Sequence, residues 1–364
     1  MMRFAPILAL ATLMAAAPQG NAAITAPAKG KTETVLAHAV DDVIRPGYHA
    51  FHDSTKGLGT AMTALCATPS AETLTAAKSA FAGTLKAWGP VEIYRTGPAL
   101  EQNRFERVMY YPDRKGIALK QVQAILSKKD ETAADPKTLA GKSVGVQGLG
   151  ALEFVLYGTG AETLGTEKDS LRCRYGKAIA ANLETIAGEF AAVWDAPGGI
   201  GDSWKAPGPD NPVFRNEQEA VTELLGTMVH GAEMVRDQRI KAFYPVGDTP
   251  ANPKIAILRR SGETWTLLGA NIDGLTTLWK KAHMESLLKD DQRSIASSIG
   301  FVMKSMSRAA ASLSPDIEKV VSDRDERAKV DFLLLNGKDL ILRLSDDYGA
   351  ALGLGAGFSF SDGD

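Results

Sequence analysis

Hydrophobic residues recur every three or four positions through several long segments of this 364-residue chain. The pattern is clearest at 68–88, where Leu74, Phe81 and Leu85 follow it, and at 214–241. This spacing puts the apolar side chains on one face of an α-helix, whereas a half-buried strand alternates at every second residue. Aromatic residues make up only 7% of the chain, which also favours helices over sheets. The sequence therefore predicts an all-α fold.

The helical segments are separated by short breaks and fall into two groups along the chain. We expect helices at about 32–66, 68–88, 117–128, 148–158, 170–195, 214–241, 265–288, 290–312 and 315–346. Thr68 is placed to cap the second of these helices, and the Gly- and Pro-rich stretch 197–212 is predicted to be a surface loop. A chain of this length with 45% hydrophobic residues suits two domains. We therefore predict two helical-bundle domains, at 24–165 and 166–364.

The last predicted helix has a competing interpretation. Within 326–346, apolar residues alternate on both sides of Asn336 and Gly337, a pair that favours the two-residue turn of a β-hairpin. The same segment carries a helical stripe that includes Leu334 and Ile341. We choose the helix because the neighbouring segments are helical.

The first residues have the composition of a secretory signal. Arg3 is followed by an apolar run at 4–17, and the small residues that a signal peptidase requires come just before residue 23. The run is too short to span a membrane, and no cysteine follows it to carry a lipid anchor. No later segment is long and apolar enough to cross a bilayer. We therefore expect a signal peptide at 1–22 and a periplasmic mature protein.

The chain has two cysteines, Cys66 and Cys173. In an oxidising compartment, an isolated pair of this kind most simply forms a disulfide. Two free buried thiols are the alternative. A metal site built on both is disfavoured, because neither has a second cysteine or a histidine beside it. We expect the disulfide.

Charge and missing motifs exclude several classes of function. The chain has 41 basic and 43 acidic residues, a net charge of −2, so it lacks the basic excess of nucleic-acid-binding proteins. It contains no phosphate-binding P-loop, no Gly-x-Ser-x-Gly nucleophile elbow and no His-Glu-x-x-His zinc-protease motif. Any site must therefore be built from other residue patterns.

Two pairs of residues have the spacing of metal ligands on a helix. His49 and His52 lie one turn apart, and so do His230 and Glu233. For each pair the alternative is ordinary: a solvated helix face for the first and an intrahelical contact for the second. Together with Glu153, these residues are the candidate ligands for an iron or zinc ion.

Glu153 is the one carboxylate in the apolar segment 148–158. Burying a lone carboxylate is costly unless a cation or hydrogen-bond donors meet it. A partner is therefore implied: an arginine, a metal ion or the N-terminus of a helix. A purely structural buried ion pair is the alternative to a functional site. Glu92, Arg95 and Asp113 are the obvious charged residues to meet Glu153 or to line a cleft with it.

Several motifs occur in order along the chain: AWGPVE at 87–92, YPDRKG at 111–116, GLGALEFVLYG at 148–158, CRY at 173–175, NEQEA at 216–220, RRSG at 259–262 and a glycine-rich end at 352–364. Together they resemble the imelysin family of bacterial envelope proteins, over about 35–364. The resemblance implies an all-helical fold of two bundle-like domains with a cleft between or beside them. It also implies the family signature Gly-x-His-x-x-Glu, a proposed metal or peptidase motif.

In this chain the signature lies at 148–153, with Gly150 at the histidine position and Glu153 as the carboxylate. A glycine side chain can neither ligate a metal nor act as a base. With the export signal, this predicts a non-catalytic periplasmic binding protein for uptake or sensing of iron or another metal-linked ligand. Its expected partners are a small ligand or metal ion and envelope iron-uptake proteins. The alternatives are a metallopeptidase, and a structural or partner-binding envelope protein with a vestigial site.

The residues expected to line the cleft are charged or polar and come from these motifs: Glu153, Glu92, Arg95, Asp113, Arg260 and Ser261. Glu153 would be the central acceptor, and the arginines would orient it or an anionic group of the ligand.

Overall fold

The structure, a computed structural model, describes residues 30–247 and 249–354. Within that part of the chain the fold is all-α, as predicted, and no strand occurs. The signal peptide predicted at 1–22 lies outside the described residues, and so does 355–364. None of the described helices is long and apolar enough to cross a membrane.

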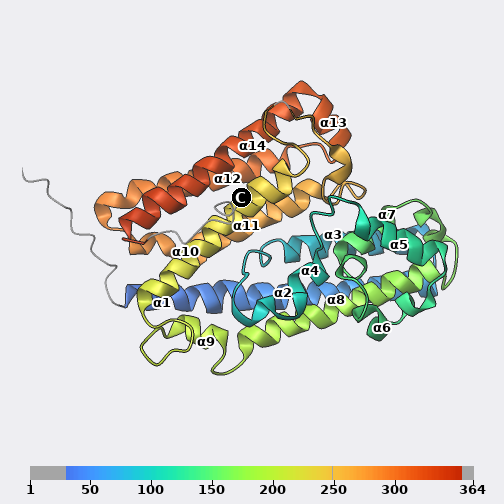
Figure 1. Ribbon diagram of the computed structural model, residues 1–364, viewed down its shortest axis with the longest axis horizontal. Helices are drawn as coiled ribbons and strands as arrows, with labels where there is room; N and C mark the ends of the chain where they lie inside the picture. Colours follow the sequence, from blue (N-terminus) through green and yellow to red (C-terminus); the bar gives the residue numbers. More distant parts are fainter. Residues whose placement is uncertain (1–29, 248, 355–364) are drawn as a thin grey trace, which may run out of the picture.

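Figure 1 shows two layers of long helices with a cluster of shorter helices at one end. The first layer contains α1 (Lys31–His38), α2 (Arg45–Ala67), α3 (Ala71–Trp88), α8 (Leu171–Asp195) and α9 (Ile200–Lys205). The second contains α10 (Glu217–Glu233), α11 (Thr264–Lys281), α12 (Arg293–Ala311), α13 (Ile317–Ser322) and α14 (Arg324–Leu342). The end cluster contains α5 (Ile117–Ser127), α6 (Pro136–Ala140) and α7 (Leu149–Tyr157), and the short helix α4 (Arg104–Val108) packs against α8 nearer the middle of the molecule. Three π-helical segments, η1 (Ala39–Ile44), η6 (Met234–Lys241) and η10 (Arg343–Gly349), continue α1, α10 and α14.

Aromatic side chains hold the first layer together. α2 packs along both α8 and α3. The ring of Tyr48 on α2 stacks on Phe190 of α8, with centroids 5.0 Å apart, and Phe51 of α2 lies at the same distance from Trp88 of α3. All four side chains are fully buried. Large apolar rings contribute most per residue to a core, so this cluster accounts for much of the packing of the first layer.

The two layers approach each other closely where α3 ends. α11 packs across α3, and Gly89 and Gly274 lie at the crossing. A Cβ atom at Gly89 would lie 2.5 Å from the Cβ of Ala270, and one at Gly274 would lie 2.6 Å from the Cα of Pro90. Both distances are far below van der Waals contact, so only glycine lets the two backbones pack this closely. The AWGPVE motif therefore positions the second layer against the first.

Most of the predicted helices are confirmed. The segment 326–346 is helical, formed by α14 and η10, so the hairpin alternative is wrong. The helical spacing of the apolar residues explains why this segment is a helix: Val330, Leu340 and Leu344 are all fully buried on one side of it.

Two local predictions are wrong. Ser70, rather than Thr68, caps α3: its Oγ accepts a hydrogen bond from the N–H of Thr73 at 3.2 Å. Thr68 instead terminates α2. The stretch 197–212 contains α9, whose Trp204 is fully buried, so it is not simply a surface loop.

The division into domains at 24–165 and 166–364 stays a prediction. α8 packs along α2, which places residues 171–195 in the first layer. The two layers in Figure 1 therefore divide the chain after α9.

The disulfide predicted between Cys66 and Cys173 is present, and it joins the end of α2 to the first turn of α8. The two Cα atoms are 5.5 Å apart. The alternative of two free thiols is therefore wrong for this pair.

We expect replacement of both cysteines, Cys66→Ser with Cys173→Ser, to lower the free energy of unfolding by about 4–5 kcal/mol. The two residues are 107 positions apart, so the bridge restricts a long loop of the unfolded chain. Urea denaturation of the wild type and the double variant measures the difference. A loss below about 1 kcal/mol would show that the bridge does not constrain the unfolded chain in this way.

Candidate functional site

A cavity of about 450 Å³ opens at the end of the molecule where α5 and α7 lie. Parts of three segments line it: 109–122, 144–154 and 254–260. The third segment comes just before α11, so the cavity lies between the end cluster and a connection within the second half of the chain. Its size falls within the range of small-molecule pockets, roughly 300–1,000 Å³.

Glu153 projects from α7 toward the segment that precedes α11. Its Oε1 accepts hydrogen bonds from the backbone N–H of Arg260 at 2.8 Å and of Ser261 at 3.0 Å. The hydroxyl of Ser261 lies 3.2 Å from the same oxygen, and the Arg260 guanidinium lies 3.8 Å from Oε2. The structure thus brings together Glu153, Arg260 and Ser261, and the partner of the buried carboxylate is an arginine with backbone donors.

The segment that meets Glu153 is a tight turn. Leu258 and Gly262 have φ values of 55° and 74°, in the left-handed region that favours glycine. The hydroxyl of Thr264 donates to the carbonyl oxygen of Ile257 and closes the turn from the α11 side. This backbone shape directs two successive N–H groups at one carboxylate oxygen.

Burial raises the pKa of the Glu153 carboxyl above its ordinary value. The hydrogen bonds from the Ser261 and Arg260 backbone and the Arg260 charge act in the opposite direction. Desolvation has the largest effect, because the side chain is 4% exposed. The carboxylate is therefore satisfied by the turn and not by solvent.

The two glycines of the signature have different roles. At Gly148 a Cβ atom would lie 2.3 Å from the carbonyl oxygen of Val108 and 2.5 Å from that of Arg107, so α7 begins directly against the backbone of α4. At Gly150 a Cβ atom would meet nothing within 4 Å, and the residue lines the cavity. The position of the signature histidine is therefore open space one helical turn before Glu153.

Asp113 lines the same cavity but is committed to α5. Its carboxylate oxygens accept hydrogen bonds from the N–H groups of Ile117 at 2.8 Å and Leu119 at 3.2 Å. A carboxylate in this place satisfies free donors of the first turn and interacts favourably with the helix dipole. The charge of Asp113 therefore stabilises the N-terminus of α5.

Glu92 and Arg95 do not join this cavity. The buried Glu92 pairs with Arg239 and accepts a hydrogen bond from the amide of Asn271 at 3.0 Å. Arg95 lies over the ring of Phe105, 4.7 Å from its centroid. Both residues line a second cavity, of about 420 Å³, next to α10. Glu92 therefore links the first layer to α11 and η6 of the second layer.

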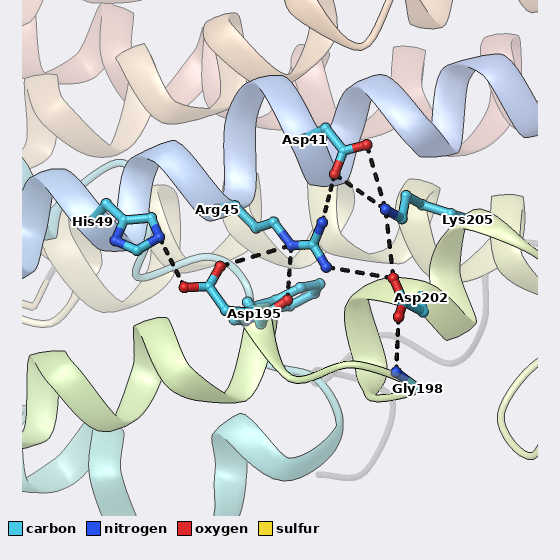
Figure 2. Close-up of polar contacts among 8 residues, drawn as sticks. Asp41, Arg45, His49, Asp195, Gly198, Asp202 and Lys205 are labelled. Carbon is cyan, nitrogen blue, oxygen red and sulfur yellow. Dashed lines mark hydrogen bonds and ion pairs between the residues drawn. The ribbon is translucent and has the colours of Figure 1, made fainter.

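His49 belongs to a surface network that Figure 2 shows. Its Nε2 lies 2.9 Å from the carboxylate of Asp195, and Arg45 in the same network pairs with Asp41 at 2.7 Å. The network ties the start of α2 to the end of α8. His52, one turn further on, lies against the backbone of α8. Neither histidine lines the cavity of about 450 Å³ that contains Gly150 and Glu153, called the signature cavity below.

His230 and Glu233 form an intrahelical pair, with Nδ1 of His230 3.0 Å from Oε2 of Glu233, and both line the second cavity.

Across 30–247 and 249–354, no three histidine, cysteine, aspartate or glutamate side chains are grouped to hold a metal ion. At the signature, Oε1 of Glu153 already accepts hydrogen bonds from the neighbouring turn. Of the candidate metal ligands, Glu153 alone lines the signature cavity, so the described residues do not form a centre of three protein ligands there.

The cavity also contains four cationic residues that the sequence analysis did not single out: Arg114, Lys115, Lys254 and Arg259 line it beside Arg260. A signal was present, since the YPDRKG and RRSG motifs each carry two adjacent basic residues. The pattern alone does not show that both motifs face one cavity.

The comparisons with known proteins agree with this fold. The family model described as Imelysin matches residues 44–344. The crystal structure of an imelysin-like protein from Psychrobacter arcticum 273-4 has a TM-score of 0.77 at 17% identity, covering 92% of this chain and 100% of the other. A protein from Parabacteroides distasonis ATCC 8503, assigned as an iron-regulated protein A precursor, has a TM-score of 0.73 at 14% identity, with 90% and 96% coverage. No curated protein matches the chain. At these identities the two structures establish the fold alone.

We expect the free energy of unfolding of the wild type, relative to Glu153→Gln, to fall as the pH rises above 4.5, the ordinary pKa of the group. The pKa of Glu153 is higher in the folded protein than in the unfolded chain. The folded protein therefore holds the proton more tightly, which stabilises the fold at low pH. This stabilisation is lost as the pH rises through the folded-state pKa and the carboxyl ionises. Urea denaturation of both proteins between pH 4 and 8 measures the difference. A constant difference across this range would contradict a raised pKa.

Proposed function

Because the chain belongs to the imelysin family, we propose that it is an exported, non-catalytic binding protein whose ligand occupies the cavity lined by Gly150 and Glu153. It would serve uptake or sensing of iron, or of another metal-linked ligand, in the periplasm. The signal-like residues 1–22 support export. The assignment of the Parabacteroides structure as an iron-regulated protein supports the link to iron.

One observation carries this proposal: the space beside Gly150 is open, and the carboxylate of Glu153 next to it already accepts hydrogen bonds from the protein. Gly150 leaves space where the signature has its histidine. Glu153 uses its oxygen to hold the N–H groups of Arg260 and Ser261 at the cavity wall. Hydrolysis needs a positioned base or a metal-bound water. The arrangement of these residues suits binding better than reaction.

A metal centre of the kind that the signature implies does not fit the described residues, so we derive no step through a metal. A metal-linked ligand does not require such a centre, because it brings its own metal-binding groups. The cavity has only to recognise the outside of that ligand.

The two alternatives have less support. A metallopeptidase would need a set of metal ligands and a base, and no grouping of the described residues favours it. The cavity of about 450 Å³ has the size of a small-molecule pocket, which favours a ligand-binding protein over a structural or partner-binding protein with a vestigial site.

Zinc and iron(II) titration by calorimetry tests the proposal. We expect the wild type and the control Gly150→Ala to show no saturable binding at micromolar metal. The variant Gly150→His should show none either, because its imidazole would lie beside a Glu153 oxygen already held by the turn, in a cavity lined by five cations. Saturable binding by this variant would show that the rest of a metal site persists. Both substitutions enter open space, so neither should disturb the fold. One tightly bound zinc or iron per wild-type chain, with peptide cleavage that a chelator stops, would overturn the non-catalytic assignment.

A further inference from the structure

Five cationic side chains surround the signature cavity. Arg114 and Lys115 come from the segment before α5, and Lys254, Arg259 and Arg260 come from the segment before α11. The chain as a whole carries a net charge of −2, so this concentration of positive charge is a local feature. Side chains of like charge that share one cavity repel one another, and an anion between them removes that repulsion.

Among the described residues, the carboxylates of the cavity pair with only one of these five cations. Asp113 accepts its hydrogen bonds from the first turn of α5. Glu153 accepts from the turn that contains Arg260, and that arginine is the one cation of the cavity near it, at 3.8 Å. Asp113 is therefore directed at backbone donors alone, and Glu153 at backbone donors and the guanidinium of Arg260.

The remaining four cations are available to a ligand. Arg114, Lys115 and Lys254 are exposed, and none of them forms an ion pair within the part of the chain that the structure describes. Arg259 donates from Nε to the carbonyl oxygen of Lys254 at 2.9 Å, which leaves its other N–H groups unused among the described residues. The mouth of the cavity is thus lined with free positive charge.

The inner surface of the cavity is apolar. Leu119 and Val122 of α5, Phe154 of α7, and Ile257 and Leu258 of the facing segment form it. A cavity with an apolar interior and a charged mouth fits a ligand with an apolar body and a charged end. Because the mouth is positive, the charged end is an anion.

We propose that the signature cavity binds a small organic anion, with its apolar body against α5 and α7 and its carboxylate, sulfonate or phosphate group between Lys115 and Lys254. This inference rests on the proposed function and names the chemical class of its ligand. A metal ion would bind in this cavity only as part of an anionic chelate, in which the organic acid supplies the metal ligands.

A matched pair of fluorescent probes tests the preference for an anion. The first is 8-anilinonaphthalene-1-sulfonate, and the second is N-phenyl-1-naphthylamine, which has the same aromatic body without the sulfonate. Both gain fluorescence on entering an apolar cavity. We expect the sulfonate probe to bind the wild type at least tenfold more tightly than the neutral probe, with an affinity that falls as salt is added.

Charge variants locate the binding site. The double variant Lys115→Gln with Lys254→Gln removes one charge from each wall at exposed positions, so it should fold normally. It should weaken binding of the sulfonate probe about tenfold and leave the neutral probe unchanged. The control Lys241→Gln with Lys338→Gln removes two charges from a different cavity, of about 740 Å³, and should change neither affinity.

A third variant separates this inference from the proposed function. Gly150→Leu places a side chain in the open space of the cavity and should abolish binding of both probes. If Gly150→Leu abolishes binding but the wild type holds both probes equally well, the cavity binds ligands and the anion preference is wrong. If neither probe binds at the cavity, or if the control variant loses the sulfonate probe instead, both the inference and the proposed binding function fail.

Competition identifies the source of the anion. Citrate and ferric citrate are each titrated against the bound sulfonate probe. Displacement by either supports an organic anion as ligand, and displacement by ferric citrate at a lower concentration assigns the site to the chelate. Displacement by neither at millimolar concentration would contradict carboxylate recognition.

Discussion

The shape of the signature cavity depends on one buried carboxylate. Glu153 lies on α7, and Arg260, whose N–H it binds, comes 107 positions later in the chain. A carboxylate removed from water needs donors, and the turn before α11 supplies them. The interaction therefore sets how far α7 lies from that turn, and with it the width of the cavity between them.

The same interaction explains why a retained glutamate does not imply a retained metal site. In this chain the carboxylate positions a wall of the cavity, and the wall that it positions is basic. Gly150 leaves the space beside it open. A bare cation would meet the positive charge of five side chains there, whereas an anion would be attracted by it. The poor fit to a metal and the proposed preference for an organic anion thus have one physical origin.

Much of the fold could be predicted because burial of an apolar stripe is a local property of the sequence, and α10 and α11 follow it closely. The prediction failed at Thr68, where Ser70 competes as a cap two residues later. It also placed Glu92 in one cleft with Glu153, because both are charged residues of the motifs that occur in order along the chain. The structure instead pairs Glu92 with Arg239, a contact that arises only when η6 packs against the first layer. No local pattern encodes such a contact, and the convergence of two basic motifs on one cavity has the same long-range character.

Hydrogen–deuterium exchange on the wild type and Glu153→Gln tests the central claim most directly, that Glu153 holds the basic wall in place. The N–H groups of Arg260 and Ser261 donate to this carboxylate, so weakening the interaction should expose them. The account predicts faster exchange in the variant for a peptide covering 254–262, with unchanged exchange in α2 and α8. Equal exchange of that peptide in both proteins would show that the wall is held by other contacts and would contradict the account.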